Sequence, residues 1–190
     1  MTMLTFLIGG ARSGKSTLAV QMGQRYAAER AAGAVHFIAT AEPFDDDLRE
    51  RINRHRSERP LEWTTAEVPV HLADAVRAAP ADMFLIIDCL TVWLANLLVH
   101  VPQPAARAQH IDDVVGALGE RAAGAKHAGT PTVVVSNEVG MGVHPETELG
   151  RSYRDELGRT NQMVAAVADQ TLLLVAGRAV TLSDPWELLR

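Results

Sequence analysis

The chain has 190 residues, 47% of them hydrophobic, which favours a single globular domain over residues 1–190 with a full-sized core. Its 18 basic and 23 acidic side chains give a formal net charge of -5, which argues against broad electrostatic binding to nucleic acid. We therefore expect no nucleic-acid partner, and any phosphate chemistry should be confined to a local site.

Secreted and membrane-spanning classes are also disfavoured. The apolar run at residues 1–9 is too short for a signal peptide, and no segment reaches the roughly 20 uncharged apolar residues that cross a bilayer. Cys89 is the single cysteine of the chain, so it cannot form an intramolecular disulfide. We expect a protein of the reducing cytoplasm with no integral membrane segment.

Short apolar runs alternate with helical patterns along the chain. Continuous apolar runs suit strands buried on both faces, and they predict strands at residues 4–10, 34–40, 82–89, 132–138 and 171–177. Composition and apolar spacing at three and four predict helices at residues 16–30, 45–59, 108–128 and 153–169, with another directly after the third strand. The alternation predicts an α/β fold in three layers, with a mostly parallel sheet covered by helices on both faces.

The stretch "GGARSGKS" lies between the first predicted strand and the first predicted helix. It matches the phosphate-binding pattern G-x-x-x-x-G-K-[ST]. In this pattern the glycines let backbone N–H groups surround an anion, the lysine reaches the outer phosphates and the serine can ligate Mg²⁺. We therefore predict a P-loop NTPase-like fold that binds a nucleoside triphosphate through Gly9, Gly10, Ala11, Arg12, Ser13, Gly14, Lys15 and Ser16. For Arg12, a solvated position without phosphate contact fits equally well.

A P-loop site also needs an acidic residue on another strand to hold the Mg²⁺ shell. Asp88 ends the apolar run "FLIID", at the edge where parallel sheets of this class collect their ligands. The alternative is a helix N-cap before "CLTVWLANLL". We favour the metal role, shared with Ser16, because an acid at a buried strand end costs desolvation free energy unless a cation or donors compensate it.

The stretch "RINRHRSER" sets one histidine, His55, among Arg51, Arg54, Arg56 and Arg59. A helix over this segment would place His55 on an apolar face, where a histidine at the edge of the core is the simpler interpretation. An imidazole near arginines is also a competent nucleophile at phosphorus, since positive charge lowers its pKa and holds a polyphosphate against it. Spacing alone leaves both interpretations open.

Together, these stretches resemble the bifunctional adenosylcobinamide kinase / adenosylcobinamide-phosphate guanylyltransferase family of cobalamin biosynthesis. The resemblance runs through nearly the whole chain, in the order "GGARSGKS", "FIAT", "RINRHRSERPLEW", "LIIDCLTVWLANLL", "VVVSNEVGMGVHPE" and "YRDELGRTNQ". It implies an enzyme that phosphorylates adenosylcobinamide with ATP or GTP, and then transfers GMP from GTP to adenosylcobinamide phosphate with release of pyrophosphate. It also implies a homotrimer.

By this resemblance, His55 is the histidine that carries the guanylyl group. Lys15 and Asp88, assigned above to the phosphates and the Mg²⁺ shell, are the other predicted catalytic residues. Some members have two adjacent histidines in this motif, whereas this chain has Arg54 at the preceding position. Arg56 and Arg59 would hold the GTP triphosphate and stabilise the charge that builds on the departing pyrophosphate.

The resemblance also implies roles for other residues, although the residues alone allow simpler structural interpretations. Thr40, Ala41 and Glu67 match positions close to the bound nucleotide, whereas the residues alone would make Thr40 a strand-end turn residue and Glu67 a solvated charge. Asn137 and Glu138 would orient water, Mg²⁺ or the acceptor hydroxyl, or they belong to a simple turn.

Two other functions remain open from the sequence. A small-metabolite kinase would use the same phosphate loop but form no covalent GMP adduct on His55. A GTP-binding regulatory protein would be expected to carry an N-K-x-D stretch that reads guanine, and the sequence has none. We favour the bifunctional enzyme, with Mg²⁺ as cofactor, GTP and ATP as substrates, and adenosylcobinamide and its phosphate as acceptors.

Overall fold

The computed structural model of the chain describes residues 3–30, 34–42, 56, 59–128 and 130–189. A seven-stranded sheet forms the centre of this described part, in the order β3-β2-β4-β5-β1-β6-β7. Six strands run parallel, and β7 pairs antiparallel with β6. The strands are β1 (Leu4–Gly9), β2 (Val35–Ala39), β3 (Thr64–Glu67), β4 (Phe84–Asp88), β5 (Thr132–Val135), β6 (Gln170–Val175) and β7 (Arg178–Leu182).

The mostly parallel α/β fold predicted from the sequence is confirmed, with all five predicted strands present. Strands β3 and β7 were not predicted. Both are edge strands and largely exposed, so neither carries the continuous apolar run of a strand that is buried on both faces.

The helices are α1 (Lys15–Ala28), α3 (Leu72–Ala78), α4 (Leu90–His100), α5 (Pro104–Ala128) and α6 (Glu148–Val167), followed by the short 3₁₀ helix η1 (Glu187–Leu189). Helices α5 and α6 begin earlier than predicted. Proline is favoured at the first position of a helix, which suits the start of α5. The Thr147 hydroxyl caps α6 by accepting a hydrogen bond from the Gly150 N–H at 3.1 Å. The predicted helix at residues 45–59 lies outside the described residues, except for Arg56 and Arg59.

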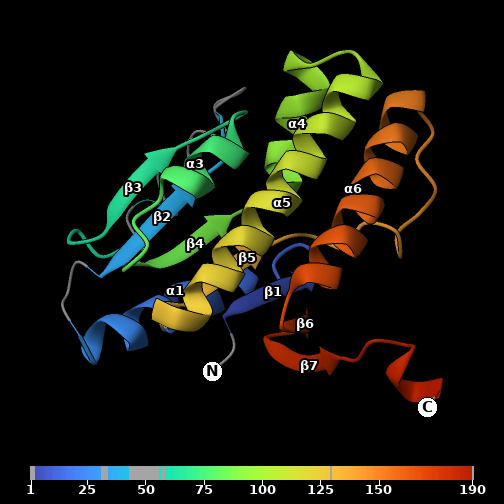
Figure 1. Ribbon diagram of the computed structural model, residues 1–190. Coiled ribbons are helices and arrows are strands. Elements are labelled where there is room, and N and C mark those ends of the chain that lie inside the picture. Colours follow the sequence, from blue (N-terminus) through green and yellow to red (C-terminus); the bar gives the residue numbers. More distant parts are fainter. Residues whose placement is uncertain (1–2, 31–33, 43–55, 57–58, 129, 190) are drawn as a thin grey trace.

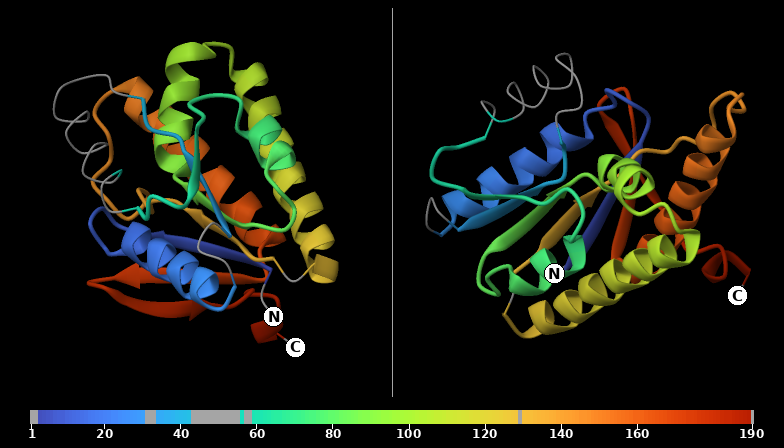
Figure 2. Two further views of the ribbon diagram at one scale, coloured as in Figure 1. Left: turned by 90° about the vertical axis from the view of Figure 1, so that its left-hand side faces the viewer. Right: turned by 90° about the horizontal axis from the view of Figure 1, so that it is seen from above.

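Helices cover both faces of the sheet, as Figures 1 and 2 show. Helix α1 packs on one face, whereas α3, α4, α5 and α6 pack on the other. Alternate residues of β4 serve the two layers: Phe84 and Ile86 join the α1 side, and Leu85 and Ile87 join the other side. Because these strands run parallel, their carboxyl ends meet along one edge of the sheet. The candidate active site lies at this edge.

Two contacts hold helices close to the sheet. Gly23 lets α1 approach the ring of Trp63 so closely that a Cβ at this position would lie 2.8 Å from it. On the other face, the indole N–H of Trp93 in α4 donates to the carbonyl of Val70 at 2.8 Å. Within the described ranges, no helix has the length and apolar character needed to cross a membrane.

Candidate active site

A cavity of about 330 Å³ opens at the carboxyl edge of the sheet. The phosphate loop and the start of α1 form one wall, and the ends of β2, β4 and β5 form the floor. Arg56, Arg59 and Glu67 form the opposite wall. The lining residues are Ala11, Arg12, Ser13, Gly14, Lys15, Ser16, Thr17, Ala39, Ala41, Arg56, Arg59, Glu67, Asp88, Cys89, Val92, Val135 and Asn137.

The phosphate loop is held in shape by close contacts with β6 and the β6–β7 turn. Gly9 fits against β6 so tightly that a Cβ would lie 2.2 Å from the Leu174 carbonyl oxygen. The N–H of Gly177 in the β6–β7 turn donates to the Ser13 carbonyl at 3.0 Å. Gly14, the N-cap of α1, has a φ of 99°, in the left-handed region that favours glycine. The shape of this phosphate-binding turn therefore depends on the β6–β7 hairpin, which comes from the other end of the chain.

Lys15 is buried and directed back along the loop. Its Nζ donates to the carbonyls of Gly9 at 2.9 Å and Gly10 at 2.6 Å, and to the Ser13 hydroxyl at 3.3 Å. Burial lowers the pKa of Lys15, while Cys89 and Asp88 act in the opposite direction. A phosphate group in the cavity would supply the negative charge that favours the charged lysine.

Asp88 ends β4 and lines the cavity together with Ser16. The N-cap of α4 is Cys89, one residue later, so Asp88 does not occupy the alternative N-cap position. Burial raises the pKa of the Cys89 thiol to about 11, and the charge of Asp88 adds to this shift, so the thiol stays protonated at neutral pH.

The donors around Asp88 fit a magnesium ion that a nucleotide brings with it. Ser16 supplies a hydroxyl and Asp88 a carboxylate, both of which are hard oxygen ligands. No group of three or more His, Cys, Asp or Glu side chains in the described part could hold a metal by itself. Phosphate oxygens and water would therefore complete the shell, as is usual for Mg²⁺ at nucleotide sites.

The opposite wall consists of charged side chains, of which Arg56 and Glu67 are exposed and Arg59 is half-buried. Arg56 forms an ion pair with Glu67, with side-chain exposures of 59% and 56%. The Arg59 guanidinium lies over the Phe37 ring, 3.8 Å from its centre. His55, Arg51 and Arg54 lie outside the described residues.

Thr40 lies beneath the cavity floor, while its neighbour Ala41 lines the cavity. The Thr40 side chain is fully buried; its hydroxyl donates to the Cys89 carbonyl at 2.7 Å and accepts from the Cys89 N–H at 2.9 Å. The Thr40 N–H also donates to the Asp88 carbonyl at 3.2 Å. These bonds tie the end of β2 to the end of β4.

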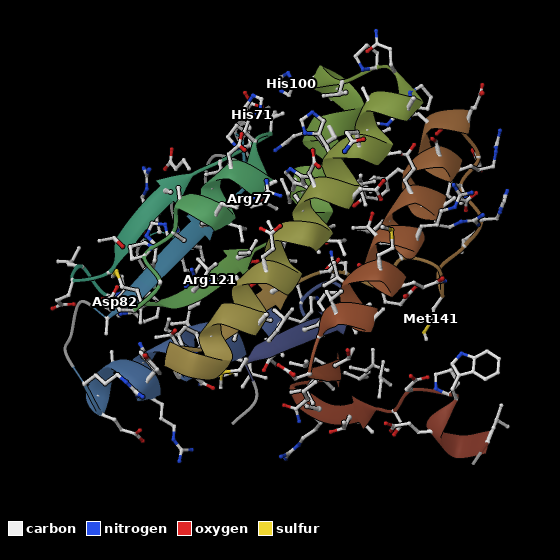
Figure 3. The ribbon with its side chains drawn as sticks, viewed as in Figure 1. His71, Arg77, Asp82, His100, Arg121 and Met141 are labelled. Atoms are coloured by element: carbon white, nitrogen blue, oxygen red, sulfur yellow. The ribbon has the colours of Figure 1, made fainter. Side chains whose placement is uncertain are left out.

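Asn96 on α4 was not found from the sequence, where it is one polar residue within an apolar helical run. It is fully buried, and its Nδ2 donates to the carbonyls of Thr40 at 2.7 Å and Pro69 at 3.0 Å. One side chain thus holds the segments that follow β2 and β3. The same helix ends at His100, labelled in Figure 3, whose Nε2 lies 2.8 Å from a carboxylate oxygen of Glu42.

Asn137 and Glu138 follow β5 at the phosphate loop. The Asn137 N–H donates to the Thr91 hydroxyl at 2.7 Å, and its side chain lines the cavity. The Glu138 N–H donates to the Gly9 carbonyl at 3.0 Å, while its carboxylate accepts from the Gly140 N–H. His144 Nδ1 lies 2.7 Å from Nη1 of Arg154 on α6. The structure thus brings Asn137, rather than the carboxylate of Glu138, into the cavity lining.

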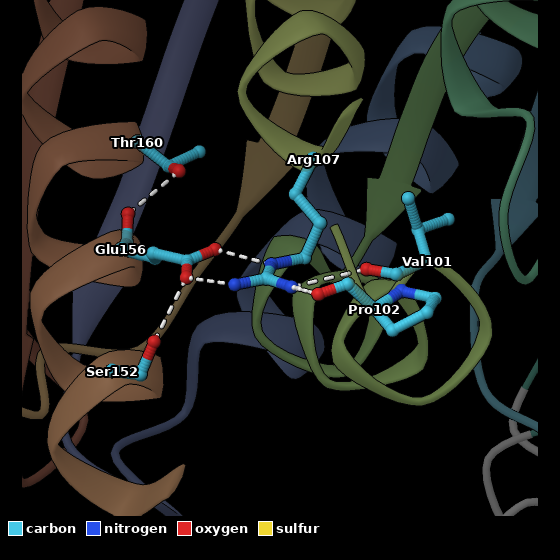
Figure 4. Close-up of polar contacts among 6 residues, drawn as sticks. All are labelled: Val101, Pro102, Arg107, Ser152, Glu156 and Thr160. Carbon is cyan, nitrogen blue, oxygen red and sulfur yellow. Dashed lines mark hydrogen bonds and ion pairs between the residues drawn. The ribbon is translucent and has the colours of Figure 1, made fainter. Parts of the chain in front are cut away.

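A largely buried ion pair joins the first turn of α5 to α6 (Figure 4). Arg107 donates through Nε at 2.9 Å and Nη2 at 2.7 Å to the two carboxylate oxygens of Glu156, and through Nη1 to the carbonyls of Val101 and Pro102. The Ser152 hydroxyl donates to the same carboxylate at 2.9 Å. Arg107 lowers the pKa of Glu156, and Glu156 raises the pKa of Arg107.

Comparisons with known proteins point to one family. The family model described as cobinamide kinase / cobinamide phosphate guanyltransferase matches residues 5–182. A bifunctional adenosylcobalamin biosynthesis protein, CobP of Pseudomonas aeruginosa, is 41% identical over 92% of this chain and 94% of its own length. CobU of Salmonella typhimurium, with the same description, is 39% identical over 94% of this chain and 98% of its own length.

A solved structure of low sequence identity shares the fold. The flagellar accessory protein FlaH from Methanocaldococcus jannaschii superposes with a TM-score of 0.53 and 14% identity, covering 95% of this chain and 78% of that chain. This likeness concerns the fold alone and agrees with the P-loop NTPase-like architecture.

Proposed function

Because the chain belongs to the cobinamide kinase / cobinamide phosphate guanyltransferase family, we propose that it phosphorylates adenosylcobinamide with ATP or GTP and then transfers GMP through a guanylylated His55. The products of the second reaction are adenosylcobinamide-GDP and pyrophosphate. The observation that carries this proposal is that Lys15, Ser16, Asp88, Arg56 and Arg59 all line one cavity.

The first reaction is a phosphoryl transfer. The acceptor hydroxyl oxygen attacks the γ-phosphorus, the bond to the β–γ bridging oxygen breaks, and the nucleoside diphosphate leaves while the hydroxyl proton is released. The phosphate loop and Lys15 hold the triphosphate, and Ser16 and Asp88 would hold Mg²⁺. When bound, Mg²⁺ neutralises charge on the phosphate oxygens.

The second reaction uses two displacements at the α-phosphorus of GTP. An imidazole nitrogen of His55 forms a P–N bond as pyrophosphate leaves, and a phosphate oxygen of adenosylcobinamide phosphate then displaces the histidine. Arg56 and Arg59 carry fixed positive charge on the cavity wall, which suits the charge that develops on departing pyrophosphate. Covalent storage of GMP lets one triphosphate site serve both reactions.

The test is to incubate the protein with Mg²⁺ and GTP labelled at the α-phosphate, and to measure label retained after denaturation, with His55→Ala alongside. Acid-labile, alkali-stable label that disappears in the variant is the expected result, because phosphoramidates have this stability. His55→Ala should keep phosphorylation of adenosylcobinamide. Absence of label in wild-type protein that binds GTP, or equal loss of both activities in the variant, would contradict the role of His55.

A further inference from the structure

We propose that the loop between β5 and α6, residues 136–147, together with the first turn of α6, forms the surface that receives the corrinoid ring of the acceptor. This inference rests on the proposed function, since it concerns the acceptor of the phosphoryl group. The main evidence is three exposed apolar side chains in this segment. They are Met141, Val143 and Leu149, and we call them the loop surface. They are 82%, 94% and 63% exposed.

The size of the cavity places most of the acceptor outside it. A volume of about 330 Å³ is at the lower end of the range for small-molecule sites, and a nucleoside triphosphate would occupy it. A corrinoid is a broad macrocycle with apolar faces and a rim of amide side chains. Only its hydroxyl-bearing arm can reach the phosphates, so its ring must rest on protein surface next to the cavity.

The order of the strands decides on which side that surface lies. Along the carboxyl edge, Glu67 ends β3 at one end of the cavity. Asn137 follows β5 at the other end, beside the phosphate loop that follows β1. The end at β3 carries the charged side chains Arg56, Arg59 and Glu67. The γ-phosphate belongs near Lys15 in the phosphate loop, so the acceptor should approach from the β5 end.

The β5–α6 loop leaves the sheet at this end. Its first residues are fixed to the phosphate loop, since the Glu138 N–H donates to the Gly9 carbonyl at 3.0 Å. In Figures 1 and 2 the loop starts beside the phosphate loop and runs outward to the start of α6, and Figure 3 shows Met141 directed away from the body of the protein. The chain therefore runs directly from Asn137, which lines the nucleotide cavity, into the segment that carries the loop surface.

The exposure of these side chains is imposed by a well-braced loop. Arg151 donates through Nη1 to the carbonyls of Pro145 at 3.2 Å and Glu146 at 2.7 Å, and Thr147 caps α6. Several exposed apolar side chains within one braced segment, rather than one alone, are the pattern expected of a binding surface. The neighbouring Arg154, which forms an ion pair with Asp155 and contacts His144, is a hydrogen-bond donor of the kind that amide side chains accept.

The test compares Met141→Ser/Val143→Ser with Leu61→Ser, a matched control whose side chain is 99% exposed in the sequence that leads into β3. We expect the double variant to raise the KM for adenosylcobinamide in the kinase reaction by at least about tenfold, since two apolar contacts are lost. Its affinity for GTP and its molecular mass by light scattering should not change, and the control should match wild type in all three quantities.

An unchanged KM for adenosylcobinamide would overturn the proposal. So would a lower molecular mass with an unchanged KM, because the loop surface would then be covered by a second copy of the chain. Hydrogen exchange gives a second measurement in the wild-type protein: adenosylcobinamide should protect residues 139–149, and no protection at saturating acceptor would also overturn it. Failure of the wild type to phosphorylate adenosylcobinamide would instead contradict the proposed function.

Discussion

Arg107 and Lys15 are buried to nearly the same extent, with 5% and 6% of their surfaces exposed, but their charges are compensated differently. Arg107 is paired with the carboxylate of Glu156, which raises its pKa. Lys15 donates to two carbonyls and a hydroxyl, and burial lowers its pKa. Arg107 is thus already compensated by a carboxylate that it hydrogen-bonds. Lys15 hydrogen-bonds to neutral groups, with Asp88 acting only through its charge, so it is suited to receive an anionic ligand.

Replacement of Lys15 should have the largest effect, and it should fall on activity. We expect Lys15→Ala to reduce both kinase and guanylyltransferase activity by about 10³-fold or more, because both reactions need the triphosphate held in the cavity. Lys15→Met, which keeps the apolar stem, should lose activity equally while its free energy of unfolding stays at or above that of wild type. Urea unfolding and the two assays measure this. Marked destabilisation of Lys15→Met would show that Lys15 is structural like Arg107.

Glu156→Gln should have the opposite pattern, with a loss of about 3 kcal/mol in the free energy of unfolding, because it leaves Arg107 buried and unpaired. The kinase rate at neutral pH should change less than about twofold, since only an interaction made in the transition state alters the rate.

The folded pKa of Glu156 is lowered, so its stabilisation is complete above the ordinary pKa of Glu and is lost as pH falls through the folded value. Urea unfolding from neutral to acid pH should therefore show the gap to wild type closing below about pH 4. A gap that is constant with pH would contradict the charge-based explanation.

The polar contacts of α4 should give an intermediate effect. Asn96→Leu leaves the carbonyls of Thr40 and Pro69 without their donor and should cost about 2 kcal/mol of stability. The KM for GTP should rise several-fold, because Ala41 loses its support. Thr40→Ser keeps the hydroxyl and should behave as wild type, whereas Thr40→Val should resemble Asn96→Leu. Equal behaviour of the two Thr40 variants would show that the hydroxyl bonds to Cys89 do not position this wall.

The smallest effect should come from the exposed ion pair at the cavity mouth. Glu67→Gln removes the partner of Arg56, and both side chains are more than half exposed, so the free energy of unfolding should change by less than about 0.5 kcal/mol. Measurements in low and high salt should agree within that margin. A loss as large as that of Glu156→Gln would mean that Arg56 is a structural cation rather than one available to a ligand.

Features that depend on local sequence were predicted well. The five apolar strands, the loop from Gly9 to Ser16 and the placement of Asp88 at a strand end follow from short patterns, and the structure contains each of them. The role of Asp88 in metal binding and that of His55 in catalysis stay predictions. Asn96 escaped sequence analysis because its burial and its two carbonyl partners come from residues far away in the chain.

The sequence by itself determined the family, the parallel α/β layering and the phosphate loop, because each is written in contiguous residues whose backbone conformation or burial is locally specified. The tertiary structure decided which charges meet. It paired Arg107 with Glu156 across 49 positions, placed Lys15 beside Asp88 and Cys89, and brought Gly177 onto the phosphate loop. Sequence periodicity shows which face of an element is buried, but only the packed fold sets what lies against that face.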